Sequence, residues 1–362
     1  MDRFNGIVSR SETDSRLWEG YLPVFHPNDN HAANLLELDN GDLLCVWFSG
    51  SGEGNPDTNV VMSRLPAGCG QWTKPQQLSD DPERSEQNPV LFQAPNGTLW
   101  LFHTSNEPHN QKTSRVVYRL SEDRGHTWSG ERVLEGNNPG LFLRHPPIVL
   151  RNGDWVLPAY YCRLNGHYSV VLISEDQGMT WEEYEVAGSV HRVQMNVAEL
   201  SDGTLYAMFR SRQAERIYTS HSYDNGRSWT VPVKSELPNN NSSTQLVRLG
   251  NGHLALIFNN SSMERDQFRW VTRKGEFRKK PLRTPLTLAI SEDEGNAWPY
   301  YRNVQMADLE YKDSEIGYSY PSIISTRDGK IHIAFSYLRK GIKYICLEEE
   351  NWVRDDVLKD RF

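Results

Sequence analysis

Two carboxylates and two histidines lie where the sequence changes from turn-forming residues to apolar runs. Glu53 and Asp57 fall in the glycine-rich segment FSGSGEGNPDTNVVMSR. A carboxylate in such a loop often only shapes a turn, but it can also act as a general acid or base. His31 and His145 each precede an apolar run, and an ordinary histidine titrates near neutral pH. These residues can supply acid–base chemistry, provided that the fold brings them together.

Arginines and tyrosines offer a second kind of chemistry, anion binding and nucleophilic attack. Arg210, Arg212 and Arg216 lie close together in MFRSRQAERIYTSHSYDNG, and a guanidinium presents a planar fork that matches a carboxylate. Arg210 and Arg212 alternate along one predicted strand and should point the same way. Tyr318 and Tyr320 share a strand face in YSYPSIISTRDG. The spacing does not choose among the three arginines.

The elements that would carry these residues are short strands in six repeated units. Each unit has an alternating apolar run, a turn that ends in glycine, and a second run. The turn glycines are Gly41, Gly97, Gly153, Gly203, Gly252 and Gly329. Asn-Gly and Asp-Gly between alternating runs indicate tight hairpins. Six such units without long amphipathic helices predict an all-β fold, a six-bladed β-propeller with one four-stranded sheet per blade.

Four near-copies of one octet accompany these units: SEDRGHTW, SEDQGMTW, SYDNGRSW and SEDEGNAW. Serine, aspartate and glycine together build a tight turn, in which aspartate accepts backbone N–H groups and glycine takes a conformation that other residues avoid. The tryptophan would pack this turn onto its blade. Because the octet recurs in successive blades and a catalytic site needs only one copy, we expect it to shape the fold and to do no chemistry.

The repeats also predict the domain organisation. We expect residues 1–362 to form a single propeller domain. A strand from residues near 3–20 would close the ring by joining the last blade. The interval between the fifth and sixth turn glycines is 77 residues, against 49 to 56 for the others. It holds the polar and basic stretch SMERDQFRWVTRKGEFRKKPLR, which we expect to be a loop.

Composition excludes several classes of protein. The net charge of −8 argues against a nucleic-acid surface, which needs a basic field. No apolar leader or membrane-spanning window is visible, so we expect a soluble, cytoplasmic protein without a membrane partner; a chain whose signal peptide had been removed would look the same. The four cysteines have no metal-ligand spacing, and nucleotide and HExxH motifs are absent from the sequence. We therefore expect no cofactor and no catalytic metal.

The octets match the Asp-box, or BNR, pattern S-x-D-x-G-x-T-W. With the six hairpin units, they make the whole chain resemble the sialidase (neuraminidase) superfamily. The resemblance implies a propeller that binds carbohydrate. Sialidases use three arginines to bind the substrate carboxylate, an aspartate as acid/base, and a tyrosine nucleophile assisted by a glutamate. Asp boxes also occur in lyases, other glycosidases and non-catalytic receptors, so the fold does not settle the function.

Four positions carry over from this resemblance. Tyr320 lies eight residues before Asp328 of the last turn, as the family nucleophile does, with Tyr318 two residues earlier as a possible substrate contact. Arg283 lies eight residues before Ser291 of a late octet, where the family places its third arginine.

The second arginine corresponds to Arg212, with Arg216 as the next choice. In the loop after the first hairpin, Asp57 matches the acid/base position better than Glu53, which stays a candidate substrate contact. These assignments follow from the resemblance and not from the spacing alone.

Two positions depart from the family pattern. His31 stands where the first arginine belongs, and Gln194 stands where the assisting glutamate belongs. Glutamine cannot act as a base, so ordinary sialidase chemistry is weakened. His31 could bind a sugar hydroxyl or act as a base itself. His145, Asn88 and Gln194, at the starts of other units, are candidate sugar ligands.

Three functions stay open on this evidence. We rank first an exo-acting glycosidase for an acidic sugar, either a sialic-acid-like ulosonate or a uronate. A lyase acting on a uronate on the same scaffold comes second, with a role for His31 or His145. A non-catalytic glycan-binding propeller comes third. The sugar, the linkage, the stereochemical course and the oligomeric state are not predicted.

Overall fold

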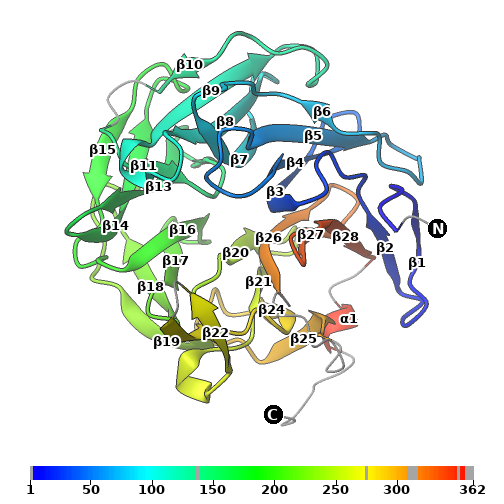
Figure 1. Cartoon of the computed structure of the whole chain (residues 1–362). Coiled ribbons are helices and arrows are strands. Elements are labelled where there is room, and N and C mark those ends of the chain that lie inside the picture. The colour runs from blue at the N-terminus through cyan, green and yellow to red at the C-terminus, as the bar shows by residue number, and fades with distance from the viewer. Residues whose placement is uncertain (1–2, 135–137, 274–275, 308–316, 349–350, 355–362) are drawn as a thin grey trace.

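Six antiparallel sheets stand around a central axis in the computed structural model, which describes residues 3–134, 138–273, 276–307, 317–348 and 351–354. Figure 1 shows the ring viewed along this axis, with the inner strands around the centre. The arrangement is a six-bladed β-propeller and confirms the predicted all-β fold class.

The strands of each blade run outward from the axis. Blade 1 consists of β3 (Asp29–Glu37), β4 (Leu43–Gly50), β5 (Asn59–Leu65) and β6 (Gln76–Gln77), and blade 2 of β7 (Ser85–Gln93), β8 (Leu99–Asn106), β9 (Arg115–Ser121) and β10 (Arg132–Val133). In blade 3, β11 (Leu141–Leu143) and β12 (Ile148–Val149) pair one after the other along the same edge of β13 (Trp155–Arg163), which is followed by β14 (Gly166–Ser174) and β15 (Glu182–Glu185). Blade 4 consists of β16 (Arg192–Glu199), β17 (Leu205–Ser211), β18 (Arg216–Ser222) and β19 (Val233–Pro238), and blade 5 of β20 (Gln245–Arg248), β21 (Leu254–Asn259), β24 (Leu286–Ser291) and β25 (Tyr300–Gln305).

Blade 6 joins the two ends of the chain. Its inner strands are β26 (Tyr318–Ser325), β27 (Ile331–Tyr337) and β28 (Gly341–Leu347). The N-terminal strand β2 (Leu17–Tyr21) pairs antiparallel with β28, and β1 (Val8–Arg10) adds outside it. These pairings hold the first strands of the sequence against the last, so the ring has no open junction between blade 6 and blade 1.

The turn glycines have the backbone that the sequence predicts. All six lie between the first and second strands of their blades, with φ between 83° and 94°. A side chain at such φ values is strained, which is why glycine recurs at these turns. The hairpin repeat is therefore a backbone requirement repeated six times.

The octets form the turns between the third and fourth strands of blades 2 to 5. In the first copy, Ser121 Oγ donates to Asp123 Oδ1 and accepts from Gly125 N, both at 2.8 Å. Asp123 Oδ1 also accepts from Thr127 N at 2.8 Å. The same serine-to-aspartate bond recurs in the other three copies. Each octet thus satisfies its own backbone and serves the fold.

The loops divide between two faces because neighbouring strands are antiparallel. The glycine turns and the octets lie on one face. The opposite face, here called the upper face, holds the loops between second and third strands and the starts of the inner strands. The apolar core lies between adjacent blades, where Trp47 and Trp155 are almost completely buried. Among the described residues, no helix is long and apolar enough to cross a membrane.

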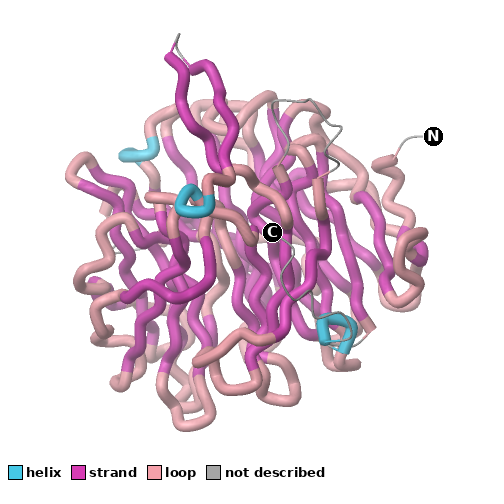
Figure 2. The backbone as a smooth tube through the Cα atoms, turned by 90° about the horizontal axis from the view of Figure 1, so that it is seen from below, coloured by secondary structure: helices cyan, strands magenta, loops and turns pink. Residues whose placement is uncertain are grey.

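The basic stretch in the fifth interval folds differently from the prediction of a loop. It forms a separate two-stranded hairpin, β22 (Phe268–Arg273) paired with β23 (Glu276–Pro281), inserted between β21 and β24. Figure 2 shows it projecting beyond the rest of the ring. The described helical segments are short: the 3₁₀ turns Gln111–Thr113 and Met263–Arg265, and α1 (Asn351–Arg354).

Candidate active site

Four inner strands share one irregularity near their starts on the upper face. Each has a register shift, and within each shift one non-glycine residue has positive φ: Ala32, Asn88, Gln194 and Tyr320, at 62°, 49°, 52° and 52°. A bulge with such a residue re-aims a side chain at some cost in backbone strain, and such strain often marks a functional site. Asn88, Gln194 and Tyr320 thus occupy equivalent positions in three blades.

The hydroxyl of Tyr320 accepts hydrogen bonds from two side chains of blade 4. Arg210 Nη1 donates to it at 2.6 Å and Gln194 Nε2 donates at 3.3 Å. Arg210 Nη1 also donates to Gln194 Oε1 at 2.9 Å, which holds the three groups together. Because the phenol oxygen is the acceptor in both hydrogen bonds, these bonds favour the phenolate over the phenol.

The positive charges around Tyr320 act in the same direction as these bonds and lower its pKa. Burial raises the pKa of Tyr320, and the nearby Glu53 raises it further. The positive charges of Arg210 and Arg283 and the bond from Gln194 outweigh both effects, so the net pKa lies below the ordinary tyrosine value. A buried tyrosine with a lowered pKa is a candidate nucleophile or base.

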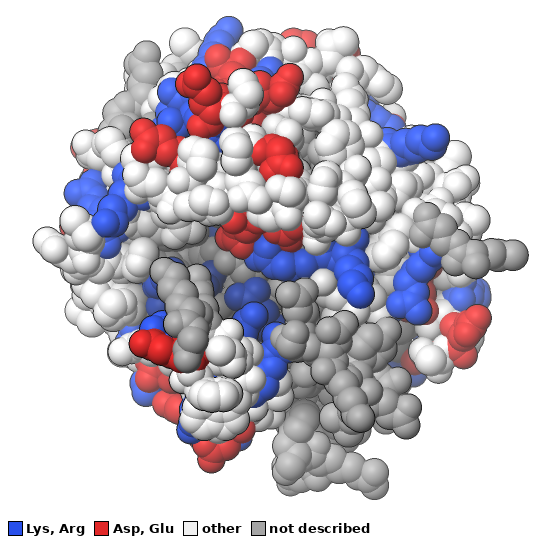
Figure 3. Space-filling model, in the orientation of Figure 1, with Lys and Arg blue, Asp and Glu red and all other residues white. Residues whose placement is uncertain are grey.

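Guanidinium groups surround the tyrosine ring. The Cζ atoms of Arg144, Arg210 and Arg283 lie 5.3, 5.7 and 5.6 Å from its centroid. Burial lowers the pKa of Arg283 to about 10, and the charges of Arg210 and Arg339 contribute to this shift. Figure 3 shows Lys and Arg atoms gathered in a hollow at the centre of this face. Like charges held so close together create a strong field for an anion.

Arg144 has a mainly structural position in this group. It is almost completely buried, and its Nη2 donates to the carbonyl oxygens of Ala33, Tyr320 and Pro321 at 2.9 to 3.1 Å. Its Nε lies 3.2 Å from Ser243 Oγ. Arg144 therefore connects inner strands of different blades beneath Tyr320 and supports the bulge from below.

The loop between β4 and β5 brings one of its two carboxylates to the site. Glu53 pairs with Arg339, whose Nη1 also lies 2.8 Å from Asp29 Oδ2. Burial raises the pKa of Glu53, but the charge and hydrogen bond of Arg339, with Arg283 and Arg210, lower it overall. About 37% of the Glu53 side chain is exposed, so it stands at the mouth of the hollow.

Asp57 makes its contacts within the same loop. Its Oδ1 accepts from Ser51 Oγ at 2.8 Å, and its Oδ2 accepts from Ser51 N at 3.1 Å. These bonds shape the turn. The geometry thus places Glu53, rather than Asp57, in the field of the arginines and Tyr320.

The two histidines are buried and neutral. His31 Nδ1 lies 2.7 Å from Ser336 Oγ, and its ring lies 4.2 Å from that of Tyr320. Burial, followed by the charges of the arginines, lowers the pKa of His31 well below the ordinary value. Burial and then Arg144 do the same for His145. The prediction that these histidines titrate near neutral pH does not match their surroundings.

Three predicted binding residues lie away from Tyr320 Oη. Arg212 follows the end of β17; its N donates to His191 O at 3.0 Å, and its charge acts on His167 and Cys162. Arg216 pairs with Glu264 at 2.7 Å.

Tyr318 belongs to the apolar core between blades 5 and 6. Its ring packs against Tyr337, with the two centroids 5.3 Å apart. Arg283, Gln194, His31 and Glu53 do gather around Tyr320, as the preceding distances and charges describe. Their roles remain predictions.

Sequence reasoning missed Arg144, Arg339 and Asp29, and it named Arg210 only as one of three arginines among which the spacing does not choose. The order of the sequence had placed Arg210 and Arg212 on one face of a strand, but β17 ends at Ser211. Arg210 pairs across the sheet with Val193, the neighbour of Gln194. This register, which spacing along the chain does not reveal, brings Arg210 to Tyr320.

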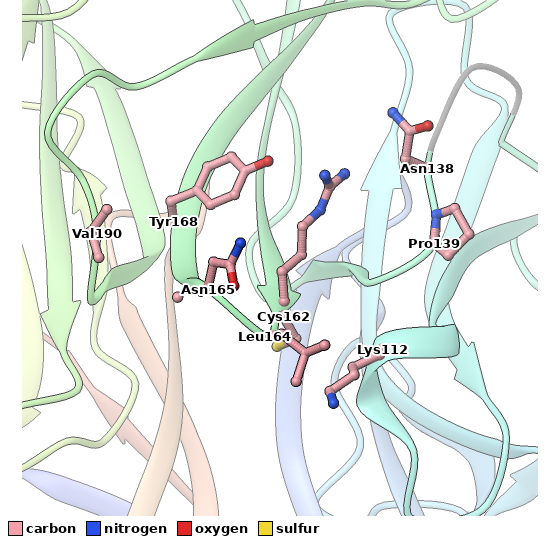
Figure 4. A pocket seen from close by; sticks show the side chains of 10 residues that line it. Lys112, Asn138, Pro139, Cys162, Leu164, Asn165, Tyr168 and Val190 are labelled. Carbon is pink, nitrogen blue, oxygen red and sulfur yellow. The ribbon is translucent and has the colours of Figure 1, made fainter.

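A second hollow of about 650 Å³ opens between blades 2 and 3. Figure 4 shows Lys112, Asn138, Asn165 and Tyr168 around it. Among the described residues, its lining includes no aspartate, glutamate or histidine, and burial raises the pKa of its Cys162 thiol to about 12. The hollow around Tyr320, which combines a carboxylate, several arginines and a tyrosine with a lowered pKa, is the better candidate for an active site.

Comparison with known proteins agrees with this geometry at the level of the fold. The family model for the BNR repeat-like domain matches residues 41–333. By sequence alone, the chain matches none of the curated proteins searched. Among solved structures, it superposes on a Hadza microbial sialidase, Hz136, with a TM-score of 0.71 and 16% identity, over 90% of this chain and 66% of that one.

Two further structures are similar to a comparable degree. A leech intramolecular trans-sialidase, solved with 2,7-anhydro-Neu5Ac, gives a TM-score of 0.71 at 13% identity, over 92% of this chain and 70% of that one. A protein of unknown function from Dyadobacter fermentans gives 0.72 at 15% identity, over 92% of this chain and 98% of that one. Such low identities establish the fold alone.

Proposed function

Because this chain belongs to the family of BNR repeat-like domains, we propose that it is a glycoside hydrolase that removes an acidic, sialic-acid-like sugar from the end of a glycan. The observation that carries the proposal is the hydroxyl of Tyr320, which accepts hydrogen bonds from Arg210 and Gln194 in a buried cationic hollow. The similarity to two sialidase structures adds support at the level of the fold.

In this proposal, arginines activate the Tyr320 nucleophile, a role that a glutamate has in sialidases. Gln194 cannot remove a proton, but Arg210 and Arg283 lower the pKa of Tyr320 and increase its phenolate fraction. A tyrosine phenolate that attacks a carbon carrying a carboxylate would otherwise be repelled by the negative charge of that carboxylate. In this site, the same arginines hold the substrate carboxylate and reduce that repulsion.

Arg283 and Arg339 are the proposed anchors for the carboxylate, together with Arg210. Arg283 makes a long hydrogen bond, 3.4 Å, from Nη2 to Asn241 O. A substrate carboxylate can replace such a weak bond with a charge-assisted pair. Two further residues are proposed contacts for sugar hydroxyl groups: His31, whose ring is tilted against that of Tyr320, and Asn88, at the equivalent bulge in blade 2.

Glu53 is the proposed acid/base in place of Asp57. In the free protein its pKa is lowered, which keeps it ionised. A bound substrate carboxylate neutralises part of the charge of Arg283 and Arg210, so the pKa of Glu53 rises when substrate binds. Protonation of Glu53 on binding would then provide the proton that the leaving group needs.

The proposed reaction has two displacements. Tyr320 Oη bonds to the anomeric carbon while the glycosidic C–O bond breaks and the leaving oxygen takes the proton of Glu53. A water then gives its proton to Glu53 and attacks the same carbon, which breaks the tyrosyl bond and restores the phenolate. Two inversions at one carbon retain its configuration.

The absence of an assisting carboxylate at Gln194 favours elimination as a second candidate function. A Tyr320 phenolate could remove the proton α to a uronate carboxyl held by the arginines. The tyrosine would then pass this proton to the oxygen of the leaving glycan while the C–O bond at the β carbon breaks, which leaves an unsaturated sugar and restores the phenolate. The buried, neutral histidines do not assist this step by charge.

Mass spectrometry of products in water enriched in oxygen-18 tests both candidates. Wild type and Tyr320→Phe would act on a panel of sialosides, Kdo-type glycosides and uronate-capped oligosaccharides. Hydrolysis predicts a released acidic sugar that carries the heavy oxygen with wild type and is lost with the variant. A product that is lighter by one water and absorbs in the ultraviolet, as a double bond conjugated to the carboxylate does, establishes elimination instead. Binding without turnover of any member would overturn both proposals and leave a glycan-binding propeller.

A further inference from the structure

The hairpin β22–β23 is a two-stranded sheet that leaves the ring beside the candidate active site. Leu282, immediately after it, donates its N–H to Gln267 O at 3.0 Å. Its carbonyl accepts from Ser261 Oγ at 2.8 Å and from Asn240 Nδ2. The next residue is Arg283, which lies against Tyr320. The base of the hairpin is therefore joined to the wall of the hollow.

One side of the hairpin is aromatic. The register pairs Trp270 with Lys279 and Thr272 with Phe277, and residues directly opposite in an antiparallel pair point to the same side. Phe268 belongs to this side by alternation. Lys279 Nζ lies 4.0 Å from the centroid of Phe268 and 5.7 Å from that of Trp270. This side, with Phe268, Trp270, Phe277 and Lys279, is called the arm surface below.

The arm surface is far more exposed than aromatic side chains usually are. Trp270 is 62% exposed and Phe277 is 77% exposed. A two-stranded hairpin is only marginally stable in water by itself, and clustered exposed apolar groups commonly mark a binding site. Burying these rings against a ligand would remove their apolar surface from water and so stabilise the hairpin.

The charge of the hairpin indicates the chemistry of that ligand. Residues 268–281 contain six basic residues and one acidic residue, whereas the chain as a whole has a net charge of −8. An aromatic ring can support the apolar face of a sugar, and a neighbouring ammonium group can pair with a carboxylate. Lys279 lies among the rings, whereas Arg269, Arg278 and Lys280 alternate onto the opposite side of the hairpin. An aromatic side with one ammonium group, on a hairpin of net positive charge, thus fits an anionic oligosaccharide.

We propose that the arm surface binds the part of an anionic glycan that extends beyond the sugar held at Tyr320. The inference rests on the proposed function for its choice of ligand. The hairpin stands on the same face as the hollow, because it belongs to a loop between the second and third strands of its blade. The proposed glycan runs from the arginines of the hollow across the base of the hairpin and onto Trp270 and Phe277.

Binding and turnover, measured separately, test this proposal. A Trp270→Ala/Phe277→Ala double variant would be made in wild type and in the Tyr320→Phe background. Tyr223→Ala is the matched control, since Tyr223 is 76% exposed but lies in an octet on the other face. Unchanged melting temperatures would show that each variant folds.

In the Tyr320→Phe background, calorimetry with carboxylated oligosaccharides of one to six sugars should show affinity that grows with length. Losing two stacked rings should cost about tenfold in Kd for the longest chain and nothing for the single sugar. Tyr223→Ala should leave Kd unchanged for the longest chain and for the single sugar. In the active protein, the arm variant should raise KM for long chains and spare kcat/KM on a single-sugar substrate.

The outcomes separate the arm from the catalytic proposal. If binding grows with length and needs Trp270 and Phe277 but no substrate is turned over, the arm-surface proposal stands and the hydrolase proposal is overturned. If substrate is turned over but affinity is the same for all lengths, with and without the two aromatic rings, the arm-surface proposal is overturned and the hydrolase proposal stands. Two other partners of the arm surface would be tested in parallel: vesicles containing about 30% anionic lipid, and a second copy of the chain, detected as self-association at rising protein concentration. If the arm surface binds vesicles or a second copy and does not bind oligosaccharides, the proposal is also overturned.

Discussion

Arg210 Nη1 lies 2.6 Å from the hydroxyl oxygen of Tyr320, although the two residues are 110 positions apart and belong to blades 4 and 6. Asn241 Oδ1 accepts from Arg210 Nε at 2.9 Å and from Nη2 at 2.7 Å, so the guanidinium plane has a fixed orientation. A tyrosine whose oxygen faces an immobilised cation needs little reorganisation to become a phenolate. The predictions on catalysis below start from this pair.

Replacing Arg210 should change the ionisation of Tyr320. Arg210→Gln removes the cation that lowers the pKa of Tyr320, so the pKa should rise. Tyrosinate absorbance during an alkaline titration measures this, with Tyr320→Phe identifying the signal. If activity needs the phenolate, its rising limb should move to higher pH, and activity at neutral pH should fall by about 10²-fold. A limb that stays in place would argue that Tyr320 does not act as a phenolate.

Glu53→Gln and Asp57→Asn should separate the two carboxylates of one loop. If Glu53 is the acid, Glu53→Gln should lose about 10²- to 10⁴-fold in activity on an alkyl glycoside. The loss should be much smaller on a glycoside with a phenol leaving group, which needs no proton. Asp57→Asn should mainly weaken the turn at Ser51. The reverse ranking would return the acid role to Asp57.

Alanine at an octet glycine, Gly178, or at a hairpin-turn glycine, Gly153, should affect stability and leave catalysis alone. A Cβ at Gly178 would lie 2.9 Å from Trp155 and about 3.0 Å from Trp100, whereas a Cβ at Gly153 has no atom within 4 Å. Both glycines have positive φ. Gly153→Ala should therefore cost about 1–2 kcal/mol in free energy of unfolding, from backbone strain alone. Gly178→Ala should cost more, because it also displaces packed tryptophans.

Denaturant unfolding followed by tryptophan fluorescence would measure the free energy of unfolding of Gly153→Ala and Gly178→Ala. Activity per folded molecule should stay at the wild-type level, since the turns lie on the face opposite Tyr320. Equal costs for the two alanines would contradict the packing explanation.

Glu86 should give stability a specific dependence on pH. It is fully buried beside the buried His103, with Oε1 3.9 Å from Nδ1. Burial raises the pKa of Glu86 to about 7, from 4.5 in the unfolded chain. The folded protein thus holds an extra proton between these values, and the contribution of Glu86 to stability is lost as pH rises from about 4.5 to 7.

Relative to wild type, Glu86→Gln should become more stable as pH rises through that window. The limiting slope for one proton is about 1.4 kcal/mol per pH unit. His103, whose pKa burial lowers to about 3, contributes in the opposite direction in both proteins, so the difference between them isolates Glu86. Urea unfolding at pH 4.5, 5.5, 6.5 and 7.5 would measure it. A constant difference over this range would contradict the raised pKa.

Local sequence determined the repeat and its turns. Positive φ at Gly41 and its five counterparts, and the serine–aspartate bonds of the octets, depend only on residues within a few positions of each other. Such contacts form in any copy of the motif, which is why the six-bladed fold could be predicted. The family spacing that singled out Tyr320 and Arg283 also placed two residues that lie together in the structure.

The tertiary structure alone decided which other side chains reach Tyr320. Arg210, rather than Arg212, arrives because β17 ends at Ser211 and pairs in a particular register with β16. Glu53, rather than Asp57, faces the arginines because Arg339, 286 positions away, comes to it from blade 6. These choices depend on ring closure and on bulges in separate strands, and residue spacing along the chain carries no information about distances across the ring.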